Sequence, residues 1–285
     1  MGKNIAIITD TDSSLPVELA KKYHIEQVPI TIHFGDRSFT TGVDINDQTV
    51  FEMVDRLNKI PTTAAPSPGA FAEVFKKAFR EGADAVVCIC VSSKISATYS
   101  AAVTAREMMP EKDITIIDSL NLSMGQGLIS LSVAEALSRG AKPGDIQPLV
   151  DNLNPRLHTF ALLPSLKYLA MSGRVGKLAA GMADTLLIKP ILTTREGKLE
   201  LLEKIRTNRK ALIRLLELTR ESVGDNQIER MAIIHVNNPG GANELEMELR
   251  KILVCPAEVI HAEFSAGLSV HAGNGVVGVV IQTNR

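Results

Sequence analysis

The stretch Val86-Val-Cys-Ile-Cys-Val91, followed directly by Ser92-Ser-Lys-Ile-Ser-Ala-Thr98, decides the fold of this chain. A short apolar run predicts a buried strand, and the hydroxyl-rich residues after it predict a loop that opens a helix. The same order occurs in residues 5–14 and again in residues 114–125. Ligands of open α/β sheets bind outside the carboxyl ends of the strands, where helix N-termini favour anions. The sequence therefore predicts a site for a small anionic head group, lined by hydroxyl and amide groups.

The composition is that of a globular protein and excludes several classes of partner. The 285 residues are 45% hydrophobic, with a net charge of −1 and only 4% aromatic residues. Without a basic stripe or stacking aromatics, nucleic acid is not an expected partner. The three cysteines lack metal-ligand spacing, so neither a metal nor another cofactor is expected, and a reduced, cytoplasmic setting fits. No apolar run approaches the roughly 20 residues of a membrane span. A strand starts almost at the N-terminus, which argues against a signal peptide. Stable membrane insertion is therefore not expected, although the composition is compatible with transient contact with a membrane.

The order of elements predicts an α/β protein of two domains. Residues 1–156 alternate strands and helices, which is typical of a three-layer α/β/α domain with a mostly parallel sheet. Residues 157–285 mix the two kinds of element, which predicts a two-layer α/β domain with a mixed sheet. Asn154-Pro155 marks the boundary. In the second domain we expect strands at 187–193, 199–204, 231–236, 258–264 and 276–282, and helices at 208–223 and 241–252.

One motif offers an enzymatic alternative. Ile8-Thr-Asp10-Thr-Asp12-Ser resembles the first motif of haloacid-dehalogenase-type phosphatases, in which one carboxylate attacks phosphorus and the second exchanges a proton with the leaving group. A Mg²⁺-dependent phosphatase with Asp10 as its nucleophile also needs a distal acidic pair, of which Asp225 is the only hint. In the other interpretation Asp10 and Asp12 organise their loop and cap a helix.

Two further segments carry candidate ligand contacts. Pro61-Thr-Thr-Ala-Ala-Pro-Ser-Pro-Gly69 predicts a loop that stays non-helical up to Pro68. Its Thr62 and Thr63 are suited equally to satisfying turn backbone and to contacting a ligand. In Tyr168-Leu-Ala-Met-Ser-Gly173-Arg-Val-Gly176, Arg174 is suited equally to capping a helix and to binding an anion.

His271 is the titratable group of a glycine-rich stretch, residues 264–275, which we expect to be a loop before the last strand. A structural role and a ligand contact are about equally favoured for this histidine.

Taken in order, these segments resemble the DegV family, the fatty-acid-binding proteins of the bacterial fatty acid kinase system. The resemblance covers essentially the whole chain. It rests on Thr9-Asp10 with Leu15-Pro16, Thr63 with Pro66-Ser67-Pro68 and Phe71, Ser92-Ser93 with Ile95-Ser96 and Thr98-Tyr99, Asp118-Ser119 with Gly125 and Gly127, Tyr168-Leu169 with Gly173-Arg174 and Gly176, Lys189-Pro190-Ile191, and His271-Ala-Gly273.

The resemblance implies a DegV-like two-domain fold that buries the acyl tail of a long-chain fatty acid. It also implies a carrier without catalytic residues, which presents the acid to a separate ATP-dependent kinase subunit for conversion to an acyl phosphate. Arg206 matches a basic segment implicated in that partnership. A carrier of another amphiphile is the remaining alternative. The residues that the resemblance places at the carboxylate are Thr63, Ser96 or Ser93, and His271, with Arg174 and Thr62 nearby.

The chain departs from the family pattern at several positions. Ala97 stands where Gly usually follows Ser96, and Ser172 replaces the first Gly before Gly173. Asn274 replaces a usual Pro, and Ala64-Ala65 replaces Ser-Gln. We expect lipid binding to survive these changes, with Ala97 the one most suited to narrowing the head-group pocket.

Overall fold

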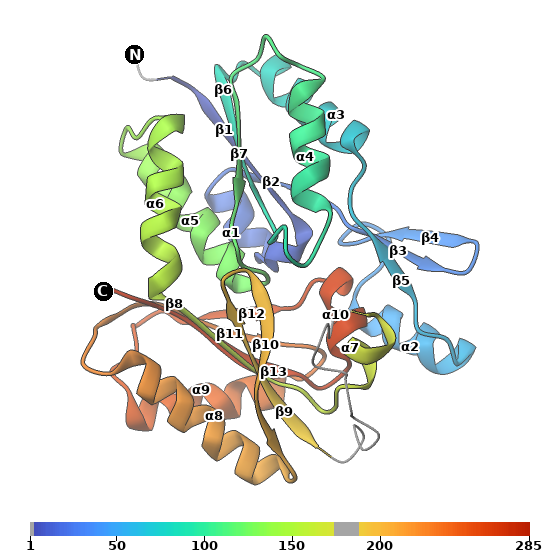
Figure 1. Cartoon of the computed structure of the whole chain (residues 1–285), viewed down its shortest axis with the longest axis vertical. Coiled ribbons are helices and arrows are strands. Elements are labelled where there is room, and N and C mark those ends of the chain that lie inside the picture. The colour runs from blue at the N-terminus through green and yellow to red at the C-terminus, as the bar shows by residue number, and fades with distance from the viewer. Residues whose placement is uncertain (1–2, 174–187) are drawn as a thin grey trace.

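The N-terminal half is built on a parallel sheet of four strands (Figure 1). This computed structural model describes residues 3–173 and 188–285. The strands β1 (Ile5–Asp10), β2 (Ile25–Val28), β6 (Ala85–Cys90) and β7 (Ile114–Asp118) lie in the order β2-β1-β6-β7. From β1 the chain continues to β2 on one side of β1, and it later returns as β6 on the other side of β1. The loops that follow β1 and β6 therefore diverge, which makes this position a topological switch point.

Helices cover both faces of this sheet, as expected for a three-layer domain. Helices α3 (Pro68–Arg80) and α4 (Thr98–Glu107) lie on one side, while α5 (Met124–Ser138) and α6 (Ile146–Leu153) lie on the other (Figure 1). Helix α1 (Val17–Lys22) connects β1 to β2.

A small antiparallel sheet projects from the side of the molecule (Figure 1). It consists of β4 (Arg37–Thr40), β3 (Thr31–Phe34) and β5 (Thr62–Ala64), with α2 (Asp47–Leu57) between β4 and β5 in the chain. The expectation of a loop at β5 was wrong, because the edge of the β3–β4 hairpin accepts three residues of this segment as a third strand. The expected start of α3 at Pro68 is confirmed.

The C-terminal half is built on a mixed sheet, as the sequence predicted, but the sheet has six strands, because residues 157–162 form a strand that the sequence analysis did not predict. Only β11 and β12 pair in parallel, and the other neighbours are antiparallel. Helices α8 (Asn208–Val223) and α9 (Pro239–Ile252) cover one face (Figure 1). In spatial order the strands are β10 (Lys198–Ile205), β9 (Lys189–Arg195), β8 (Leu157–Leu162), β13 (Val277–Thr283), β11 (Ile228–His235) and β12 (Ile260–Glu263).

Two short helices, α7 (Lys167–Met171) and α10 (Ala266–Ala272), pack against one another. The expectation of a glycine-rich loop around His271 was wrong, because most of that stretch is α10. Ser265 caps this helix by accepting a hydrogen bond from Leu268 N at 3.2 Å, and all of its residues except His271 are buried. Burial against neighbouring elements thus outweighs the low helix propensity of Gly267.

Helix α5 joins the two halves into one core. Its first eleven residues are buried, and it contacts β1 and β6 of one sheet as well as β8, β11 and β13 of the other. A helix that is apolar on all sides belongs in the interior of a protein. The largest apolar cluster accordingly extends from Ile7 to Val280 and includes residues of both sheets.

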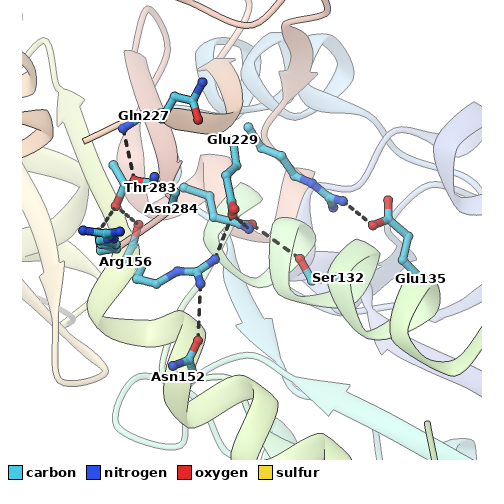
Figure 2. Close-up of polar contacts among 11 residues, drawn as sticks. Ser132, Glu135, Asn152, Arg156, Gln227, Glu229, Thr283 and Asn284 are labelled. Atoms are coloured by element: carbon cyan, nitrogen blue, oxygen red, sulfur yellow. Dashed lines mark hydrogen bonds and ion pairs between the residues drawn. The ribbon is translucent and has the colours of Figure 1, made fainter. Parts of the chain in front are cut away.

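Polar contacts lie at one end of this apolar interface between the two halves. Arg156 donates a hydrogen bond of 2.8 Å to Glu229 (Figure 2). Gln282 donates to the same carboxylate. Glu135 of α5 accepts from Arg230 of β11. These contacts lie beside the predicted domain boundary at 156/157, which stays a prediction: the two large sheets separate there, while the core does not.

Candidate functional site

The three loops that follow β1, β6 and β7 meet, as their positions in the sequence predicted. Asp10 Oδ2 accepts a hydrogen bond from Val91 N at 2.8 Å, and Ser123 N donates to Asp12 O at the same distance. Most of their hydroxyl groups bind neighbouring protein groups. Ser92 Oγ, for example, donates to Gly197 O at 2.7 Å and so fixes the β9–β10 turn on the N-terminal half.

A cavity of about 60 Å³ lies between these loops and the face of the six-stranded sheet that α8 and α9 do not cover. Its walls are mainly apolar, and most of them belong to the shared core. The lining residues are Ile95, Leu122, Ser123, Thr159, Ala161, Leu163, Leu169, Leu192, Thr193, Thr194, Leu199, Ile234, Phe264, Leu268, His271 and Ala272. An apolar cavity with few polar groups is the usual form of a small-molecule site.

His271 lines this cavity and also makes a polar contact with the three-stranded sheet. Its Nε2 lies 2.9 Å from Thr63 Oγ1, at hydrogen-bond distance. Both residues are partly buried, and His271 lines the cavity. When Nε2–H is the donor in this contact, the threonine hydroxyl still has its own proton to donate to a carboxylate.

A network of hydroxyl groups holds α10, and therefore His271, in place. Ser265 Oγ donates to Asp12 Oδ1 at 2.9 Å, and Ser265 N donates to Ser14 Oγ at 3.2 Å. Ser14 Oγ also accepts from Ser123 Oγ at 3.2 Å. The loops of the parallel sheet thus fix the start of the helix that carries the histidine.

The close approach at Gly267 shows how tightly α10 is seated. A Cβ atom at this position would lie 2.8 Å from Asp12 Oδ1 and 3.1 Å from Ile30 Cγ2. Only glycine allows so short a separation between α10 and the β1 loop.

Ser93 and Ser96 flank Ile95, which lines the cavity, and both are partly buried. Ser96 Oγ lies 2.8 Å from Thr98 Oγ1, and Ser93 N donates to Asp118 Oδ1. The two serines that the sequence offered as alternatives therefore both lie in the loop beside the cavity, and each forms a hydrogen bond within the N-terminal half.

The remaining predicted residues are dispersed. Thr62 is exposed, as expected for the neighbour of Thr63 on a strand, where successive side chains point to opposite faces. Arg206 is exposed between β10 and Thr207, the N-cap of α8. Arg174 lies outside the described residues.

Asp10 is a structural carboxylate. Its side chain is completely buried and accepts hydrogen bonds from Val91 N, Gln126 Nε2 and Asp12 N. Burial raises its pKa to about 6, while these donors oppose the shift. A carboxylate held this way is inaccessible to a phosphate ester, which favours the loop-organising role over the phosphatase. No cluster of three or more His, Cys, Asp or Glu suited to a metal ion occurs in residues 3–173 and 188–285.

A model of the protein family described as "Uncharacterised protein, DegV family" matches residues 4–284. The chain belongs to the DegV family. It is 33% identical to a DegV domain-containing protein of Caldanaerobacter subterraneus over 98% of this chain and 99% of that protein. It is 29% identical to Protein DegV of Bacillus subtilis, over 97% and 98% respectively.

Solved structures of DegV proteins share the fold. A DegV family protein from Thermus thermophilus, described by its fatty acid binding, superposes with a TM-score of 0.91 at 26% identity, covering 98% of this chain and 99% of that one. Bacillus subtilis DegV, described as a fatty acid binding protein, gives a TM-score of 0.88 at 28% identity, covering 99% and 100%. No helix in the described part of this DegV chain is long and apolar enough to cross a bilayer.

Two departures of this chain from the usual DegV pattern, Ala97 and Ser172, are compatible with the backbone. Ala97 and Ser172 both adopt right-handed helical backbone angles, with φ of −78° and −86°, so neither position requires glycine. Gly273 and Gly275, on either side of Asn274, both have positive φ angles and are both glycine in this chain.

Sequence reasoning missed the wall of the cavity in this DegV protein. The alternation of Thr159 and Ala161 along β8, continued by Leu163 directly after it, is the signal that places these side chains on one face. Leu192 and Thr194 on β9 repeat the alternation. Periodicity alone does not show whether this face of the sheet borders the cavity or is covered by α8 and α9.

Proposed function

We propose that this protein binds a long-chain fatty acid, with the acyl tail in the apolar cavity and the carboxylate at Thr63 and His271. The observation that carries the proposal is the 2.9 Å contact between these two residues at the wall of that cavity. The description of two structural relatives as fatty acid binding proteins supports it. We assign Ser96 and Ser93, beside Ile95, to the surroundings of the carboxylate, together with Arg174 and, more peripherally, Thr62.

The cavity is small for such a ligand. Its 60 Å³ is well below the roughly 150 Å³ of an engineered protein cavity that accepts benzene. Binding of an acyl chain therefore requires the side chains around the cavity to separate. The free energy gained by burying the acyl chain is large enough for this rearrangement, since each buried CH₂ contributes about 0.8 kcal/mol.

The proposed role is that of a carrier, with phosphoryl transfer performed by a separate ATP-dependent kinase subunit. A carboxylate bound at the end of an apolar cavity stays accessible to a partner, while the tail is kept from water. We assign Arg206, which is exposed ahead of α8, to the contact with that partner.

Native mass spectrometry of the purified protein, followed by extraction and identification of any bound lipid, tests the proposal. We expect a bound mass equal to that of a long-chain fatty acid, and restoration of this mass when delipidated protein is mixed with such an acid. Another extracted amphiphile would replace the fatty acid as the cargo. A protein that stays empty with every added acid would contradict the proposal.

A further inference from the structure

Three threonines, Thr159, Thr193 and Thr194, interrupt the mainly apolar wall of the cavity. Thr159 of β8 and Thr194 of β9 line it together with Ala161, Leu163 and Leu192. Phe160 pairs with Thr193, so Thr159 and Thr194 stand one position further along the same antiparallel pair. They are cross-strand neighbours on the face that points into the cavity.

Both hydroxyl groups lack a hydrogen-bond partner among the described residues. Thr159 Oγ1 and Thr194 Oγ1 are each shielded from solvent, and Thr159 as a whole is only 7% exposed. Buried hydroxyls in proteins are almost always hydrogen-bonded, because leaving one unpaired forfeits its hydration without return. Two such groups side by side in a mainly apolar wall suit a polar atom that the ligand supplies.

The pair lies at a distance from the proposed carboxylate site. After β8 the chain passes through Leu163 and continues to α7. Because α7 packs against α10, which carries His271, this part of the chain lies at the end of the cavity where His271 is found. Thr159 precedes Leu163 by four residues, which corresponds to roughly 13 Å along an extended strand. A polar group that reaches the threonines while the carboxylate stays at His271 must therefore be carried well along the acyl chain.

The geometry points to an oxygenated acyl chain as the preferred cargo: a fatty acid with a hydroxyl group in its interior, bridged by Thr159 and Thr194. This inference rests on the proposed function, because it names the kind of fatty acid for the same cavity. A hydroxyl group can donate to one threonine and accept from the other, so both unpaired groups are satisfied at once. A plain acyl chain leaves both unsatisfied.

The test compares the affinity of delipidated protein for stearic acid with its affinity for stearic acids hydroxylated at successive positions, measured by calorimetry. We expect one position to bind about tenfold more tightly than stearic acid, equivalent to about 1.4 kcal/mol. Thr159→Val and Thr194→Val should abolish this preference and bind stearic acid at least as tightly as the unaltered protein. Thr159→Ser and Thr194→Ser keep the hydroxyl and should keep the preference, which separates hydrogen bonding from a change of shape.

The outcomes distinguish this inference from the function on which it rests. If stearic acid binds and no hydroxylated acid binds more tightly, the inference is wrong and the proposed function stands. The same holds if the valine variants retain the preference, since a bridging water or another residue then accounts for it. If none of the acids binds, the proposed function itself fails.

Discussion

His271 Nε2 lies 2.9 Å from Thr63 Oγ1, although 208 positions of the sequence separate the two residues. One belongs to a short helix beside the six-stranded sheet, and the other to the edge of the three-stranded sheet. The contact exists only when both halves of the chain are folded against one another, so the proposed carboxylate site depends on the whole molecule.

Thr63→Val should weaken fatty-acid binding by roughly 10- to 100-fold, because a hydrogen bond to a charged group contributes about 1.5–3 kcal/mol. Calorimetric titration of delipidated protein measures the change. Thr104→Val is the matched control, since this threonine is exposed on α4, does not line the cavity and should leave the affinity nearly unchanged. Equal effects of the two substitutions would contradict the assignment of Thr63.

Gly267→Ala should lower the free energy of unfolding by about 1–3 kcal/mol, because the added methyl group meets Asp12 Oδ1 at 2.8 Å and a packed helix must shift. Gly240→Ala is its counterpart near the start of α9, where nothing lies within 4 Å of the added atom. This control should be neutral or stabilising, since alanine favours helix. Thermal melts of both variants check the prediction, and an unaffected Gly267→Ala protein would show that α10 is loosely seated.

Asp47 makes stability depend on pH. Its side chain is 2% exposed, and burial, with a smaller effect of Glu263, raises its pKa from 3.8 to about 7. Between these values the folded state holds a proton that the unfolded state has released, so stability falls as pH rises from about 4 to about 7. Asp47→Asn should remove this loss.

Urea unfolding at pH 5 and pH 8 measures the effect of Asp47→Asn. The variant should gain stability relative to the unaltered protein on going to pH 8. Asp55→Asn, at an exposed position of the same helix, should show no such gain. A parallel pH dependence in all three proteins would assign the effect to another group.

Arg206→Glu should slow acyl phosphate formation by the kinase about tenfold or more at limiting protein, because charge reversal at an interface mainly lowers the association rate. Fatty-acid affinity should not change, since Arg206 is exposed and does not line the cavity. Arg220→Glu reverses another exposed charge, near the end of α8, and serves as the control. Normal kinase turnover with Arg206→Glu would remove this residue from the partner surface.

The architecture was predictable because its signals are local. Apolar runs that end in hydroxyl-rich loops identified three of the four parallel strands, β1, β6 and β7, but not β2. The predicted helix at residues 208–223 is α8, with the bounds found in the structure. The meeting of the β1, β6 and β7 loops followed from one rule, that parallel strands present their carboxyl ends at the same edge.

What could not be predicted depends on contacts between distant segments. Helix α10 forms around Gly267 because burial against Asp12 and Ile30 compensates for weak helix propensity. Ser92 belongs to a hydroxyl-rich loop that the sequence placed at the ligand site, yet its hydroxyl binds Gly197 O in the second half of the chain. The alternation on β8 is visible in the sequence, but only the position of α8 and α9 shows that Thr159 faces the cavity.

The cavity is surrounded by the same side chains that hold the two halves together, among them Leu122, Leu192 and Ile234. A ligand there completes the interior of the protein, so occupancy and folding are thermodynamically linked. At a free ligand concentration 100 times the Kd, the loaded form gains about 2.7 kcal/mol over the empty one. An empty molecule is then the form that unfolds and is degraded first, and the supply of cargo would regulate how much of this protein persists in the cell.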